Sequence, residues 1–156
     1  MAKVILFELN EVPWKVIDHF VRARPNSHLA QVLRQCDQFT TTTEDDLSPW
    51  TTWPSLHRGV SGRKHQITDF NQELDEVNDA YPSIWSLKSL QGISTGVCGS
   101  LHSYPVPPST YGYPFYIPDP FAKSPETHPK EVEAFQSFNL SLSRSSGRNT
   151  SGSFPW

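Results

Sequence analysis

Alternating apolar and polar residues divide the first part of the chain into short predicted elements. The run KVILFEL at 3–9 is rich in β-branched and aromatic residues, which predicts a buried strand. Apolar residues recur at helical spacing over 13–23, so an amphipathic helix is expected there. Ser27 is suited to cap a second helix, and the run DQFTTTT at 37–43 predicts another strand.

The pattern continues with further helices and one more strand. A helix is expected over 52–60, and a second over 83–90 with Gly92 as the residue that ends it. A short buried strand is expected at 93–99 and a modest amphipathic helix at 131–142. This order of strands and helices predicts an α/β fold, a layered sheet flanked by helices. Ligands of such sheets usually bind at the carboxyl ends of the strands.

Composition divides the chain into three predicted parts. Residues 1–100 carry most of the periodic apolar pattern and form the α/β part. Residues 101–130 are rich in proline and aromatic residues and are expected to form a long loop, either functional or in need of partner structure. Residues 131–156 are expected to contain a helix followed by a Ser- and Gly-rich tail.

Charge and composition exclude several classes of protein. The chain is 36% hydrophobic and 19% charged with a net charge of -3, so it is neither a disordered tail nor a basic nucleic-acid binder. No apolar run is long enough for a membrane span, and a cytoplasmic location is expected. Cys36 and Cys98 are far apart, so buried free thiols are expected rather than a disulfide framework. No histidine pair has the spacing of a local zinc motif.

The stretch SPWTTWPSLHRGVSGRKHQI at 48–67 contains candidate chemistry. A threonine at a predicted helix start has two readings. In the ordinary one, Thr51 or Thr52 caps the helix. In the other, the threonine hydroxyl is a nucleophile, because free N–H groups at a helix start favour a bound phosphate. Spacing alone favours the cap.

Five segments, taken in order, resemble a known family. An acidic and amide-bearing end follows the first strand, and RPNSHLAQVLRQCDQFTTTT precedes TWPS at 52–55. A Gly, His and Asn run follows at 59–71, and then SIWSLKSLQGISTGVCG at 83–99. Over roughly residues 3–100, the chain resembles the N-terminal part of an alkaline phosphatase superfamily enzyme. It is closest to the nucleotide pyrophosphatase/phosphodiesterase and sulfatase-like branches.

The resemblance implies a metal-dependent phosphoric-ester hydrolase of the phosphodiesterase or phosphatase type. Thr52 would be the nucleophile, favoured over Thr51 because Pro54 follows it at +2. A divalent metal, typically zinc in two sites, would activate its hydroxyl. The implied metal-binding residues are Glu8, Asn10, Glu11 and Thr52. The implied substrate-binding residues are Ser55, His57, His65 and Asn71.

Some positions depart from the family pattern. Asn10 replaces the usual Asp, and an amide is a poorer ligand than a carboxylate, while Glu11 replaces the usual Gly or second Asp. Sulfatases of this superfamily have Cys or Ser at the nucleophile position, within a Cys/Ser-x-Pro-x-Arg pattern. This chain has Thr52 at the nucleophile position and Leu56 at the position of the Arg, so a phosphate ester is expected as substrate rather than a sulfate ester. His102, after the strand at 93–99, could face the substrate.

The family's later Asp and His metal ligands are not found within the 156 residues. An N-terminal fragment of the enzyme is therefore expected. The alternative is a non-catalytic remnant or interaction domain without a complete metal site. The expected partner is a small phosphate ester, without nucleic acid or membrane, and homodimerisation is one route to covering an incomplete sheet.

Overall fold

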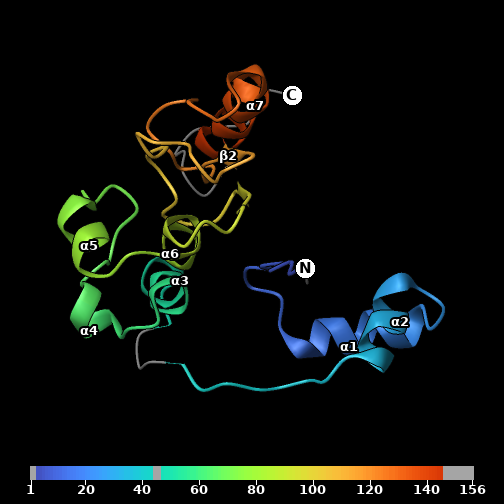
Figure 1. The fold of residues 1–156 in the computed structure, drawn as a ribbon. Helices are drawn as coiled ribbons and strands as arrows, with labels where there is room; N and C mark the ends of the chain where they lie inside the picture. The colour runs from blue at the N-terminus through green and yellow to red at the C-terminus, as the bar shows by residue number, and fades with distance from the viewer. Residues whose placement is uncertain (1–2, 44–46, 146–156) are drawn as a thin grey trace. The chain divides into compact units, whose positions relative to one another are not determined.

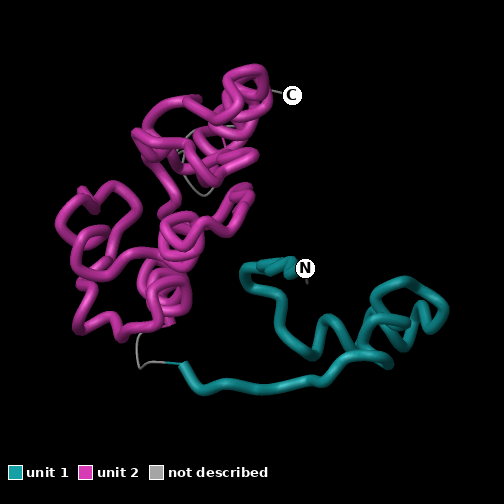
Figure 2. The backbone as a smooth tube through the Cα atoms, in the orientation of Figure 1, with its two compact units in different colours: residues 1–43 teal, residues 44–156 magenta. Residues whose placement is uncertain are grey.

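The computed structural model describes residues 3–43 and 47–145. The chain forms two compact units, residues 1–43 and 44–156, which Figure 2 shows in teal and magenta. The predicted boundary near residue 100 lies within the second unit. The Ser- and Gly-rich tail after residue 145 lies outside the described residues.

The first unit contains two helices, α1 (Trp14–Ala23) and α2 (His28–Gln35), both labelled in Figure 1. Ser27 is the N-cap of α2, and its Oγ accepts a hydrogen bond of 3.2 Å from the Ala30 backbone N–H. This bond satisfies one of the donors that a helix leaves unpaired at its start. The capping role predicted for Ser27 is confirmed.

The two segments of the first unit that were predicted to be strands do not pair as strands in the structure. Residues 3–9 and 37–43 have no assigned strand, although both are placed. Val4 is 90% exposed and Phe7 79% exposed, so the first segment is not buried as predicted. A strand is stabilised by hydrogen bonds and side-chain pairs with a neighbour. In the described part of the first unit, no segment is assigned as a strand that could pair with either of them.

The second unit begins with four helices. They are α3 (Pro49–Arg58), α4 (Gly62–His65), α5 (Asp75–Ala80) and α6 (Ile84–Leu90). Helix α3 starts three residues before the predicted 52–60, because Ser48 occupies the N-cap position and Pro49 follows at the first helical position. Pro54 consequently lies inside the helix.

Helix α6 ends as predicted. Gly92 has φ +71°, a left-handed conformation that glycine adopts without the steric cost of a side chain. Its N–H donates to the Ser89 carbonyl at 2.9 Å, and the Ile93 N–H donates to the Lys88 carbonyl at 3.0 Å. This pair of bonds is the Schellman arrangement, which satisfies carbonyls left over at the helix end.

The sheet in the second unit is small. Strand β1 (Val97–Cys98) pairs in parallel with β2 (Tyr116–Ile117), with Val97 opposite Tyr116. The other side of β2 forms an antiparallel bridge between Tyr116 and His128. The predicted strand at 93–99 is thus found only over its last part. The larger layered α/β sheet stays a prediction.

The proline-rich segment is packed on its own unit. It contributes to the hydrophobic cluster, which consists of Trp85, Val97, Val106, Tyr113 and Tyr116. After it come a short 3-10 helix, η1 (Lys130–Val132), and α7 (Glu133–Arg144). No helix in the described parts of the chain is long and apolar enough to cross a membrane.

Candidate functional site

Thr52 lies at the end of the first turn of α3 and is half-buried. Its backbone N–H and its Oγ1 hydroxyl both donate to the Ser48 carbonyl, each at 2.9 Å. The hydroxyl proton therefore points back along the helix. Thr51, in contrast, is only 6% exposed. Thr52 is the more accessible of the two threonines, as the nucleophile assignment requires, but it does not cap the helix.

Ser55 and His65 meet between α3 and α4. The Ser55 hydroxyl donates to the Thr51 carbonyl at 3.0 Å, and its oxygen lies 2.9 Å from His65 Nε2. On the other side of the ring, His65 Nδ1 accepts the Ile67 backbone N–H at 2.9 Å. His65 is only 1% exposed, and Ile67 is fully buried.

These contacts fix the roles of the hydrogen atoms. Because His65 Nδ1 accepts from the Ile67 backbone N–H, it carries no proton, and in the neutral ring the proton is on Nε2. The Ser55 hydroxyl uses its own proton on Thr51, so its oxygen accepts from Nε2–H. His65 therefore cannot remove the Ser55 proton in this geometry. The pair joins α3 to α4, and it does not form a nucleophile with its base.

His57 is also enclosed by protein. Its ring stacks on Trp53 at 5.7 Å between centroids and meets the edge of Trp85 at 4.9 Å. It is 3% exposed. The predicted substrate-binding residues His57 and His65 thus lie in the packed interior of the second unit, where their rings contact neighbouring side chains and backbone.

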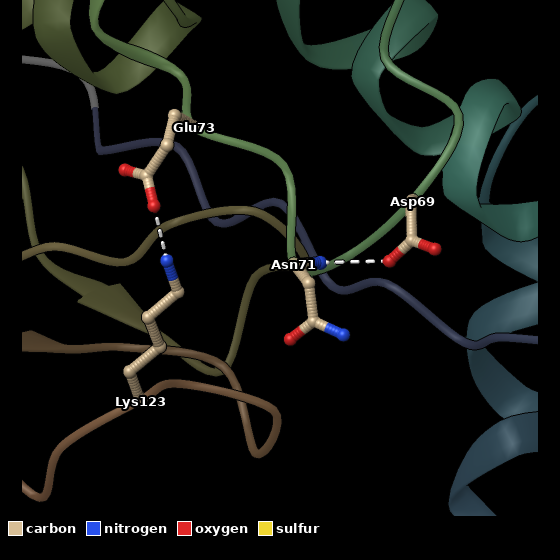
Figure 3. Close-up of polar contacts among 4 residues, drawn as sticks. All are labelled: Asp69, Asn71, Glu73 and Lys123. Carbon is tan, nitrogen blue, oxygen red and sulfur yellow. Dashed lines mark hydrogen bonds and ion pairs between the residues drawn. The ribbon is translucent and has the colours of Figure 1, made fainter.

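Asn71 lies on the surface, within an exposed turn. Its backbone N–H donates to Asp69 Oδ1 at 2.8 Å, as Figure 3 shows. A carboxylate that accepts the N–H two residues later forms an Asx turn, which is a common local device in loops. In the same view, Lys123 forms an ion pair with Glu73, and this pair joins segments 50 residues apart.

The candidate metal ligands are divided between the two units. Glu8, Asn10 and Glu11 belong to the first unit, and Thr52 belongs to the second. Glu11 has φ +54°, which is uncommon for a residue other than glycine. The sequence brings the three first-unit residues together simply by their proximity along the chain.

These donors do not complete a zinc site. Zinc sites in proteins are usually built on Cys or His side chains, whereas the three first-unit candidates provide two carboxylates and one amide. Oxygen donors of this kind suit a harder ion such as magnesium or calcium. Across residues 3–43 and 47–145, no three or more His, Cys, Asp or Glu side chains are grouped to hold a metal ion.

A cavity of about 310 Å³ lies in the second unit. It is lined by residues of the segments 70–75, 102–105 and 119–123. Trp50, from the first turn of α3, packs against the rings of Phe70 and Phe121 with centroids 5.0 Å and 5.1 Å away. Helix α3 therefore supports the aromatic wall of this cavity.

His102 is a buried histidine on the cavity wall. Its backbone has φ +61°, and the residue is 8% exposed. Its Nε2–H donates to the Asp69 carbonyl at 3.2 Å. Burial is the main reason why the pKa of His102 falls to about 4, and the nearby Arg58 charge lowers this pKa further. The ring is therefore neutral near neutral pH.

The Nδ1 atom of His102 is buried and has no hydrogen-bond partner among the described residues. In the neutral ring with the proton on Nε2, this atom is an acceptor. A buried acceptor without a partner costs free energy and calls for an explanation, and binding of a donor is one. The only signal for His102 in the sequence was weak, namely its position after a predicted strand.

Asp119 is a buried carboxyl group on the same wall, with 4% exposure. Burial raises its pKa, while hydrogen bonds from the Phe121, Tyr104 and Ser103 backbone lower it. The Phe121 N–H donates to Asp119 Oδ1 at 2.9 Å. Sequence reasoning missed Asp119, because a single Asp between two prolines has no motif around it.

No protein family, curated protein or solved structure matches the chain.

Proposed function

We propose that the chain is the N-terminal part of a metal-dependent phosphoric-ester hydrolase in which Thr52 is the nucleophile. The observation that carries the proposal is the ordered resemblance of residues 3–100 to the alkaline phosphatase superfamily. The position of Thr52 supports it, since this half-buried hydroxyl lies in the first turn of a ten-residue helix. The positive end of a helix dipole favours a phosphate group near that turn.

The proposed reaction transfers the phosphoryl group in two steps. Thr52 Oγ1 forms a bond to phosphorus while the bond to the leaving alcohol breaks and that alcohol takes up a proton. Water then cleaves the ester between Thr52 and phosphorus, and releases inorganic phosphate from a phosphomonoester substrate or a phosphomonoester from a phosphodiester substrate. In the structure the hydroxyl proton is shared with the Ser48 carbonyl, which is not a base. Attack therefore requires another acceptor for this proton. A divalent ion, when bound, supplies the Lewis acid that lowers the pKa of the hydroxyl.

The remaining parts of the proposal follow from the same family. The substrate is a small phosphodiester or phosphomonoester, and the enzyme acts in the cytoplasm. Glu8, Asn10 and Glu11 provide metal-binding oxygen atoms from the first unit, and further ligands come from outside the 156 residues. In this proposal Ser55 and His65 position helix α3 and do not contact the substrate.

A second candidate function is an interaction domain without catalysis. The exposed apolar residues of the segment 3–9 favour it, because Val4, Ile5 and Phe7 are each more than three-quarters exposed. Contiguous exposed apolar residues are a common mark of a protein interface.

The experiment compares Thr52→Val with Thr52→Ser and with the control Thr68→Val, which replaces an exposed threonine of the same unit. Hydrolysis of bis-p-nitrophenyl phosphate and p-nitrophenyl phosphate is measured with added zinc or manganese, on this chain and on any longer in-frame product. We expect activity only in the longer product. Thr52→Val should lower it by about a thousandfold or more, with an unchanged melting temperature.

Retained activity in Thr52→Val would rule out Thr52 as the nucleophile. Loss of activity in Thr68→Val to the same extent would show that the assay reports on folding. Absence of activity in every product would favour the interaction domain. Detection of phosphothreonine at position 52 by mass spectrometry, absent in Thr52→Val, would support the two-step reaction directly.

A further inference from the structure

The cavity beside His102 has an excess of negative charge. Its lining includes the carboxyl groups of Glu73, Asp75 and Asp119, and one ammonium group, that of Lys123. Lys123 is paired with Glu73. Asp75 and Asp119 are left without a cation among the lining residues. A phosphate or carboxylate ligand would meet repulsion from the exposed carboxylate of Asp75.

The hydrogen-bonding groups of the cavity also disfavour an anion and favour a ligand that donates hydrogen bonds. His102 donates from Nε2 to the Asp69 carbonyl and has an unpartnered acceptor, Nδ1, on the other side of a ring that is nine-tenths buried. A carboxylate is also purely an acceptor when it is ionised. The lining also carries donors on Gln72, Tyr104 and Lys123, so the acceptors are concentrated on the side of the cavity with Asp75 and Asp119, and that side matches a ligand that donates.

The apolar part of the cavity is aromatic. The rings of Phe70 and Phe121 lie 5.3 Å apart between centroids, and Trp50 packs against both. Aromatic faces attract cations through their negative centres and also cover apolar groups. A volume of about 310 Å³ lies at the lower end of the range for small-molecule sites.

We propose that this cavity is a binding site for a small organic cation, a protonated amine attached to an apolar ring or short chain. The ammonium group would contact the carboxylates of Asp75 and Asp119, next to the buried ring of His102. The apolar part would lie against Phe70 and Phe121. This site goes beyond the proposed hydrolase and does not depend on Thr52 or on a metal ion.

The test uses three probes of one shape and different charge: benzylammonium, benzyl alcohol and benzoate. Each is titrated into the 156-residue chain near neutral pH, and binding is followed by shifts of backbone amide signals in two-dimensional NMR. We expect benzylammonium to bind at least about tenfold more tightly than benzyl alcohol, because only the cation gains from the carboxylates. The largest shifts should be those of residues 102–105 and 119–123.

A matched pair of variants on α5 tests the charge. Asp75→Asn removes a carboxylate that lines the cavity, and Asp79→Asn removes one from the same helix that does not. We expect Asp75→Asn to weaken benzylammonium binding by about fivefold, and Asp79→Asn to leave it unchanged. Both positions are exposed, so neither substitution threatens folding.

Each other outcome overturns the proposal. Equal affinity for benzyl alcohol would show an apolar hollow without charge selection. Tighter binding of benzoate would show an anion site on Lys123 or His102. Equal effects of the two α5 substitutions would indicate a general surface potential. No saturable binding of any probe would mean that the cavity has no ligand of this class.

Discussion

The contact between Ser55 and His65 allows a sharp prediction about the role of this pair. Replacing Ser55 with alanine removes the oxygen that accepts the His65 Nε2–H at 2.9 Å. The imidazole is 1% exposed, so its N–H would find no water in place of the hydroxyl. Leaving a buried donor without a partner costs about 1–3 kcal/mol. We expect Ser55→Ala to lower the free energy of unfolding by this amount.

Ser141→Ala is the matched control. Ser141 also lies in a helix, and its hydroxyl donates to the Phe138 carbonyl at 3.0 Å, but the residue is exposed and contacts no buried histidine. The control should change the free energy of unfolding by less than about 0.5 kcal/mol. Urea unfolding of the three proteins, followed by tryptophan fluorescence, measures the difference, since Trp85 lies in the hydrophobic cluster of the second unit.

A second measurement tests the tautomer itself. Nitrogen NMR of the His65 ring should show the proton on Nε2 and none on Nδ1, because Nδ1 accepts the Ile67 N–H. A proton on Nδ1, or a Ser55→Ala variant as stable as Ser141→Ala, would refute the structural role. In that case Ser55 would again be a candidate for contact with a substrate.

Two further predictions concern stability. The pKa of His102 falls from 6.5 to about 4 on folding, mainly through burial, so the unfolded chain binds this proton first as the pH falls. Stability should therefore drop between about pH 6.5 and pH 4, by at most about 3 kcal/mol. His102→Asn, which tolerates φ +61°, should flatten this part of a stability profile measured by thermal unfolding, and an unchanged slope would contradict the assignment. Gly92→Ala should lower the free energy of unfolding by about 1 kcal/mol, because alanine is strained at φ +71°. The control Ser94→Ala, at an exposed position nearby, should leave it unchanged. Equal melting temperatures of the two variants would contradict the role of Gly92 at the helix end.

Local signals in the sequence predicted the longer helices, but not the short helices α4 and α5. Ser27 and Gly92 mark a helix start and a helix end, and the structure shows both in these roles. Such signals are readable because the hydrogen bonds they make lie within a few residues of one another. The start of α3 was missed by three residues, although Ser48 and Pro49 were present as its signal.

The strands were predicted less well, because a strand depends on a neighbour that can lie anywhere along the chain. The run at 3–9 has the composition of a buried strand, yet no neighbouring strand is assigned to pair with it in the described part of its unit. In contrast, β2 comes from the proline-rich segment that was expected to be a loop. It pairs with β1, and the paired residues Val97 and Tyr116 are nineteen positions apart in the sequence. Composition cannot specify such a pairing.

The sequence by itself determined the helices α1, α2, α3, α6 and α7, the helix start at Ser27 and the helix end at Gly92, and the candidate status of Thr52. Only the tertiary structure decided that His65 donates to Ser55, and that Glu73 and Lys123, 50 residues apart, border the same cavity as Asp119. The reason is physical. A hydrogen-bond role or a buried charge depends on atoms that the fold brings together, and sequence spacing does not reveal them.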